Sequence, residues 1–234
     1  MNSRERVILA LNHQKPDKVP VDLGATAVSG ISVWALDKLR KALKLDNKIV
    51  KVQEPLQMLG YVENDIMDAL SIDVIGLWSL ETNFGYKNSD WKHWRLFDGT
   101  EVLVGHDFTV KENANGSIFI YPQGDINVAP SGILPKGGFY FDNLTRQEFV
   151  DEDLLNGRKD FKEQFILYTD DDIRHLENAV NKLYKDTNYA IIGQGLNHRY
   201  QRLIFQLQFY PCFFPTLAHL ISSIRQEIFH LLEI

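Results

Sequence analysis

The stretch "NSRERVILALNHQKPDKVPVDLG", residues 2–24, changes its local pattern twice within a short length. Asn2 and Glu5 fit a capping box, and apolar residues then recur at helical spacing, so we expect a helix over residues 3–13. Pro16 ends this helix, and "VPVDLG" follows as a short apolar strand. The opening of the chain therefore predicts a helix that leads directly into the first strand of a sheet.

Strand and helix patterns alternate from residue 19 onward. Residues 73–77, "DVIGL", and residues 189–193, "YAIIG", are continuous apolar runs, typical of strands buried on both faces of a parallel sheet. Apolar residues recur at helical spacing in residues 32–43, 55–70 and 169–187, and "IVKVQ" at 49–53 is a further strand. This order predicts an α/β fold with a parallel sheet, either open or closed into a barrel.

The middle of the chain departs from this alternation. Short β-rich runs at about residues 91–121 are separated by Asp98-Gly99 and Asn115-Gly116, which are strong hairpin signals. We interpret this region as an antiparallel β-hairpin insertion within one domain, residues 1–196. Residues 122–138 are rich in proline and glycine and are expected to form a loop.

The last residues, 197–234, form an atypical C-terminal tail. They contain no glycine, lysine or aspartate, although the preceding part of the chain uses all three freely. One interpretation is a frameshifted or otherwise altered end of a longer gene. The other is an amphipathic C-terminal helix, because apolar residues in "AHLISSIRQEIFHLLEI" share one face.

Composition narrows the class of protein. A formal net charge of -6 and a pI of about 5.6 argue against nucleic acid or an anionic membrane as a partner. The single cysteine, Cys212, excludes an intrachain disulfide and a multi-cysteine zinc site, which fits a reducing cytoplasm. The charged start "MNSRER" is unlike a signal peptide. We therefore expect a cytoplasmic protein that binds a small-molecule substrate, with its oligomeric state left open.

Candidate functional residues follow from the rule that ligands bind beyond the carboxyl ends of parallel strands. Asp22 and Glu81 are the candidate catalytic acids or bases, although an acid in such a position commonly caps a neighbouring turn. The candidate substrate-binding residues are those that supply an aromatic wall or let a backbone approach a ligand: Gly24, Trp78, Gly193 and Gly195. No metal-ligand motif is present.

The N-terminal stretch carries a family resemblance. "SRERVILALNHQKPDKVPVDLG", residues 3–24, closely resembles the signature of the uroporphyrinogen decarboxylase (URO-D) superfamily, in which an Arg-Glu-Arg-Val helix precedes an Asn-His-x-x-Pro-Asp segment and the first strand. The resemblance continues through "EPLQMLGYVENDIMDALSIDVIGL" and "WKHWRLFDGTEVLVG" and covers about residues 2–195. Since it stops just after "YAIIG", the chain resembles a C-terminally truncated member.

The resemblance implies a (β/α)8 TIM barrel, here incomplete, whose mouth holds the substrate. It also implies one of two activities: decarboxylation of uroporphyrinogen in porphyrin biosynthesis, or methyl transfer that involves a corrinoid protein or a methylated small molecule. Family members of the second kind use zinc or a corrinoid protein as cofactor or partner. No cofactor motif is evident in this chain itself.

Departures from the family pattern favour the methyltransferase-like branch. The decarboxylases bind substrate carboxylates through an Arg-Gln-Ala-Gly-Arg segment, but Ala25 stands near the expected first arginine. They also place an essential aspartate where this chain has residues 79–81, while Asp73 resembles a different family acid at the start of the strand. The alternatives are uroporphyrinogen decarboxylation and a non-catalytic fragment or small-ligand binding module. Whether the chain is an enzyme therefore stays open at this point.

Overall fold

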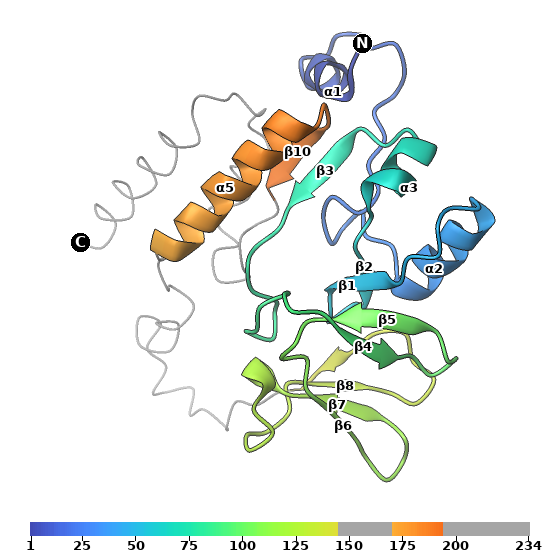
Figure 1. The fold of residues 1–234 in the computed structure, drawn as a ribbon, viewed down its shortest axis with the longest axis vertical. Helices are drawn as coiled ribbons and strands as arrows, with labels where there is room; N and C mark the ends of the chain where they lie inside the picture. The colour runs from blue at the N-terminus through green and yellow to red at the C-terminus, as the bar shows by residue number, and fades with distance from the viewer. Residues whose placement is uncertain (145–169, 194–234) are drawn as a thin grey trace, which may run out of the picture.

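The computed structural model describes residues 1–144 and 170–193 of the chain (Figure 1). The helices are α1 (Ser3–Leu11), α2 (Val33–Ala42), α3 (Asn64–Ala69), α5 (Asp170–Asp186) and the short 3-10 helix η1 (Pro122–Gly124). The strands are β1 (Val50–Glu54), β2 (Leu59–Gly60), β3 (Val74–Leu77), β4 (Lys92–Arg95), β5 (Glu101–Val104), β6 (Val110–Glu112), β7 (Ile118–Ile120), β8 (Gly132–Leu134), β9 (Asp142–Asn143) and β10 (Ala190–Gly193).

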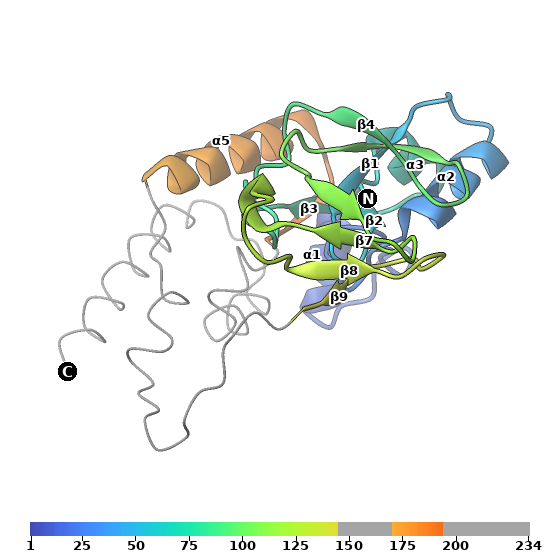
Figure 2. The same cartoon turned by 90° about the horizontal axis from the view of Figure 1, so that it is seen from below.

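The strands form three small sheets in this part of the chain. One is the parallel pair β10-β3, the second is the mixed sheet β2-β1-β5-β4, and the third is the antiparallel sheet β6-β7-β8-β9. In Figure 1 the β3-β10 pair lies with α1 and α5 in the upper part of the molecule, above the two other sheets. Figure 2 shows β7, β8 and β9 side by side, away from α5.

The expectation of a (β/α)8 barrel is wrong for the described residues. No closed barrel forms there, because β1 pairs with the antiparallel ribbon β4-β5 and with β2 instead of continuing the parallel sheet of β3. The physical reason lies in the sequence of β1. "VKVQE" alternates between buried and half-buried residues, the pattern of a strand with one covered face, whereas an all-parallel sheet buries both faces of its strands.

The start of the first helix follows the sequence pattern, whereas its end does not. The Asn2 side chain accepts a hydrogen bond from the Glu5 amide at 2.8 Å, and the Glu5 carboxylate accepts one from the Asn2 amide at 3.0 Å, so the capping box is confirmed. The helix ends at Leu11, two residues earlier than expected. "VPVDLG" forms no regular strand, since its chain turns at Gly24, where φ is +82°.

Residues 55–70 do not form the single helix that their apolar spacing predicts. Pro55 instead follows β1 directly into a turn, which leads to β2 and then to the short helix α3. The buried Glu54 carboxylate stabilises this turn, because it accepts hydrogen bonds from the amides of Leu56 at 3.0 Å and Gln57 at 2.7 Å. Side-chain capping therefore overrides the helical period here.

The antiparallel region is confirmed, and it extends further than the sequence indicates. Hairpins join β4 to β5 and β6 to β7 at the two predicted turns. The proline- and glycine-rich residues 122–138, expected to be a loop, also contain β8, which pairs with β7. Aromatic side chains pack between these elements, with Phe108 in contact with Tyr86, Trp94 and Phe141. These contacts join the two larger sheets around one core.

The two continuous apolar runs are parallel strands, as predicted, and the structure pairs them with each other. Ala190 lies opposite Val74, and the register continues to Gly193 opposite Leu77. Helix α5 covers this pair with Leu176 and Val180, as its apolar stripe predicts. Thr169, the first residue of the predicted helix, and the tail 197–234 lie outside the described residues. Within residues 1–144 and 170–193, no helix has the length and apolar character that crossing a bilayer requires.

Candidate functional site

The carboxyl edge of the β3-β10 pair brings together three segments that the sequence singled out. Gly193 ends β10 opposite Leu77, and Trp78 follows directly. On the other side of β3, the carbonyl oxygen of Ala25 lies only 2.1 Å from the position that a Cβ on Gly76 would occupy. The loop after residue 21 therefore runs against β3, and the use of these segments as a ligand site stays a prediction.

The two candidate acids lie on different turns, Asp22 before Ala25 and Glu81 in the segment after β3. Asp22 is exposed, and its side chain accepts a hydrogen bond from the Ala25 amide at 3.2 Å, which is the turn-capping role considered from the sequence. Glu81 is half-buried and lies opposite Lys87 in an isolated antiparallel bridge. In the described part of the chain the two carboxylates share no hydrogen bond or ion pair with each other. A catalytic role for either acid stays a prediction.

The candidate substrate-binding residues have different surroundings. A Cβ on Gly24 would lie 2.4 Å from a methyl carbon of Val62, so this glycine allows close packing of its loop. The Trp78 indole nitrogen folds back to 2.6 Å from the Cβ position of Gly76. Gly193 is exposed, and within residues 1–144 and 170–193 no atom outside its own chain neighbours lies within 4 Å of its Cβ position. Gly195 lies outside the described residues.

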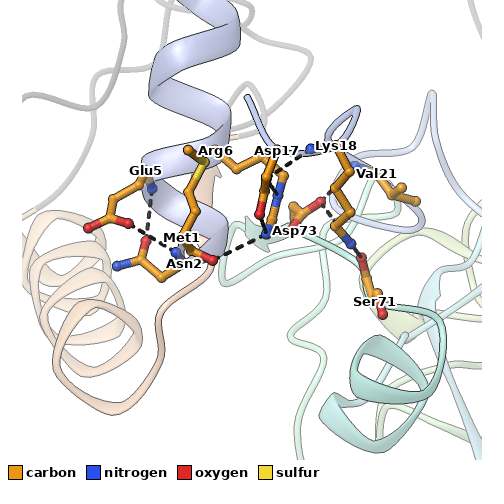
Figure 3. A network of polar contacts seen from close by, with 9 residues as sticks. All are labelled: Met1, Asn2, Glu5, Arg6, Asp17, Lys18, Val21, Ser71 and Asp73. Carbon is orange, nitrogen blue, oxygen red and sulfur yellow. Dashed lines mark hydrogen bonds and ion pairs between the residues drawn. The ribbon is translucent and has the colours of Figure 1, made fainter. Parts of the chain in front are cut away.

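A network of charged groups occupies the opposite, amino end of β3 (Figure 3). The Arg6 guanidinium, on α1, holds the Asp17 carboxylate with two hydrogen bonds, Nε to Oδ1 at 2.6 Å and Nη2 to Oδ2 at 2.9 Å. Its Nη1 donates to the carboxylate of Asp73, the residue before β3. Arg6 Nη2 also donates to the Met1 carbonyl at 3.2 Å. Bidentate pairing of this kind gives both strength and a fixed geometry.

Arg4, two residues earlier on α1, binds the end of α5 and the residues that lead into β10. Its guanidinium donates to the carbonyls of Tyr184 at 3.3 Å, Thr187 at 3.1 Å and Tyr189 at 3.4 Å. It also lies over the Tyr184 ring, 4.0 Å from the ring centroid. The last carbonyls of a helix lack partners within the helix, so a cation at the C-terminal end is stabilising. The two arginines of "RERV" thus attach α1 to the starts of both β3 and β10.

The network lowers the pKa of both carboxyl groups. Hydrogen bonds from Arg6 are the main reason why the pKa of Asp17 falls to about 2. For Asp73, burial acts to raise the pKa, but hydrogen bonds from Ser3, the Val21 amide and Arg6 together outweigh it and lower the pKa. Both groups are therefore ionised whenever the protein is folded near neutral pH.

These lowered pKa values predict a loss of stability in acid. A group with a lowered folded-state pKa stabilises the protein above its unfolded-state pKa, near 4, and that contribution disappears as the pH falls through the folded-state value, about 2 for Asp17. We expect the urea midpoint of unfolding to fall between about pH 4 and pH 2, and to fall less in Asp17→Asn. An equal decline in both proteins would contradict the role given to Asp17.

The family resemblance implies a bound zinc ion in some members, and such an ion needs a group of nearby ligand side chains. Among residues 1–144 and 170–193, no three His, Cys, Asp or Glu side chains gather as metal ligands do. The described residues therefore do not fit a protein-bound zinc ion, and no step of the function proposed below depends on one.

Arg6 and Asp17 lie within the N-terminal stretch that resembles the family signature, but the sequence gives neither a role. Asp73 is predicted only to start its strand. The signal that could have joined them is an acid at the head of a fully apolar strand, because such a buried charge needs a cationic partner. Comparison with protein-family models, curated proteins and solved structures finds no match to this chain.

Proposed function

We propose that this chain is a member of the URO-D superfamily and takes part in methyl transfer, with its small-molecule ligand held at the carboxyl edge of β3-β10. What supports family membership is the N-terminal resemblance together with the positions of its charged residues. Arg6, Asp17 and Asp73 are far apart in the sequence, yet they meet in one network. The proposal does not include a closed barrel.

The charge of the loops at this edge is the observation that favours methyl transfer over uroporphyrinogen decarboxylation. The loop segments 22–26 and 78–81 contain the acids Asp22 and Glu81 and no lysine or arginine; Lys87 lies next to Glu81. A porphyrinogen with several carboxylates needs paired cations in its site, since an unpaired buried charge is costly. The edge therefore favours a methylated ligand of small or positive charge over uroporphyrinogen.

The proposed roles of the edge residues are binding and orientation. Trp78 provides an aromatic wall beside the backbone of Ala25 and Gly76, which approach each other closely. In the reaction the bond between the methyl carbon and the donor breaks, with its electron pair left on the donor, and a pair on the acceptor forms the new bond. The acceptor is a corrinoid protein or a thiol, in keeping with the family resemblance. The protein aligns donor and acceptor.

An activity assay with matched variants tests the proposal. The purified full chain is incubated with a methylated amine or methyl ether plus a corrinoid protein and, in a parallel assay, with uroporphyrinogen. We expect methylation of the corrinoid protein and no loss of carbon dioxide from uroporphyrinogen. Trp78→Ala should lower the methylation rate at least about tenfold, the scale of one lost positioning contact. Trp91→Ala removes a ring that lies near Lys51 of β1 instead, and it should leave the rate unchanged.

The other outcomes favour the alternatives. Decarboxylation without methyl transfer would support the porphyrin-pathway reaction. No turnover of either kind by protein that unfolds cooperatively would contradict the proposed activity and favour a non-catalytic ligand-binding module. Equal effects of Trp78→Ala and Trp91→Ala would contradict the location of the site.

A further inference from the structure

Asp73 lies at the amino end of β3, away from the proposed ligand site. It nevertheless connects β3 to the two other segments of that site, the loop after Val21 and β10. Its amide donates to the Val21 carbonyl at 2.8 Å, and its carboxylate accepts from the Val21 amide at 3.0 Å. Its own carbonyl accepts from the Ala190 amide at 2.9 Å. One residue thus contacts the segment before Asp22 on one side and the start of β10 on the other.

These contacts determine the alignment of the segments along the strand direction. A slip of one residue would reverse the faces of every side chain in the strand that moves. With Ala190 opposite Val74, Gly193 is brought level with Leu77; with Val21 beside Asp73, Ala25 is brought beside Gly76. The edge lies about 13 Å from Asp73, which is four residues of strand.

The rest of the network holds the Asp73 carboxylate in place. The side chain of Asp73 is buried, with 1% of its surface exposed, and it is the only described carboxylate that contacts both Arg6 and the Val21 amide. Lys18 reinforces the same junction, because its ammonium donates to the Ser71 carbonyl at 3.0 Å and lies 3.8 Å from Asp73. Figure 3 shows these groups converging on Asp73 from α1, from residues 17–21 and from the turn before β3.

We propose that Asp73 is a positioning residue: from the amino end of β3 it sets the register in which the loop after Val21, Trp78 and Gly193 are presented at the carboxyl edge. Arg6 acts through Asp73, while Asp17 holds Arg6 and accepts a hydrogen bond from the Lys18 amide at 2.9 Å without touching Val21. This inference rests on the proposed function only in taking that edge as the ligand site. Its test needs no ligand, so its failure is distinguishable from a failure of the methyl-transfer assay.

The test compares Asp73→Ala with Asp17→Ala in the full chain, because each variant removes one carboxylate from Arg6 but only Asp73 contacts Val21. Amide exchange is measured at Val21 and Ala190, and the tryptophans are labelled with 5-fluorotryptophan for fluorine NMR. The Trp78 signal is assigned with Trp78→Phe. In Asp73→Ala we expect Val21 exchange to accelerate at least about tenfold, and the Trp78 signal to shift while the Trp94 signal stays.

In Asp17→Ala we expect both the Val21 exchange rate and the Trp78 signal to match the parent, even where the melting temperature falls. Equal changes in the two variants, or an unmoved Trp78 signal in Asp73→Ala, would overturn the proposal and leave Asp73 a purely stabilising residue. If Asp73→Ala does not fold, Asp73→Asn, which keeps an oxygen for the Val21 amide, should retain slow Val21 exchange. In the parent protein, fast exchange at Val21 would overturn the proposal without any variant.

Discussion

Replacement of Arg6 by methionine is expected to lower the melting temperature by about 10 °C. Methionine keeps much of the length and the apolar stem of the side chain but removes the guanidinium that joins Asp17 to Asp73. The Asp73 carboxylate is buried, so it would be left with the Ser3 side chain, the Val21 amide and the more distant Lys18 ammonium, without a close cation. A buried charge that loses its partner is strongly destabilising, whatever the net contribution of the intact pair.

A matched control separates burial from charge. Lys41 pairs with Asp37 at 2.6 Å one turn away on α2, and 66% of the lysine side chain is exposed. Lys41→Met removes a cation from an ion pair of similar length, yet water screens this pair, so we expect a change of less than about 2 °C. Differential scanning calorimetry of the three proteins makes the comparison. Similar losses for Arg6→Met and Lys41→Met would show that the network contributes no more than a surface pair.

The elements that could be predicted are those in which local sequence and burial agree. The capping box at Asn2, the helix at α2 and the acidic start of α5 each follow from side chains that satisfy nearby backbone groups. The strands β3 and β10 follow from continuous apolar runs, because these need cover on both faces. In each case a short stretch of sequence contains the whole reason for the structure.

The barrel could not be judged from such stretches, because strand pairing depends on partners far away in the chain. β1 pairs with β5, where Val102 lies opposite Val50 although it is 52 residues later in the chain, and nothing within "VKVQE" identifies that partner. The same limit applies to residues 55–70, where the capping of a turn by Glu54 outweighs apolar spacing. The family resemblance gave an expectation of topology that the described residues do not follow.

The sequence predicts where the candidate site lies more readily than it predicts the contacts of the individual side chains. The rule for parallel strands predicts one edge for Asp22, Trp78 and Gly193, and β10 does end level with β3, with Gly193 opposite Leu77. It could not show that the Asp22 side chain caps a turn, or that Gly24 packs on Val62, because both depend on the path of the loop. The charged network at the other end was missed as a unit, since its members come from three separated segments.

Replacement of Gly76 by alanine is expected to lower the free energy of unfolding by about 2–3 kcal/mol. The new methyl group would lie 2.1 Å from the Ala25 carbonyl oxygen and 2.9 Å from its carbon. These are backbone atoms, which cannot move aside as the end of a flexible side chain can. The loop must therefore separate from β3, and the Trp78 indole, whose nitrogen lies 2.6 Å from the same position, must move with it.

Gly193→Ala is the matched control, because Gly193 ends the neighbouring strand and no described atom outside its chain neighbours lies within 4 Å of its Cβ position. We expect its free energy of unfolding to stay within about 0.5 kcal/mol of the parent. Urea unfolding gives both values, and tryptophan fluorescence of the folded proteins should differ from the parent only in Gly76→Ala. A stable Gly76→Ala protein with unchanged fluorescence would mean that the loop does not lie against β3. In that case the three segments would not share one edge, and the location proposed for the ligand would be wrong.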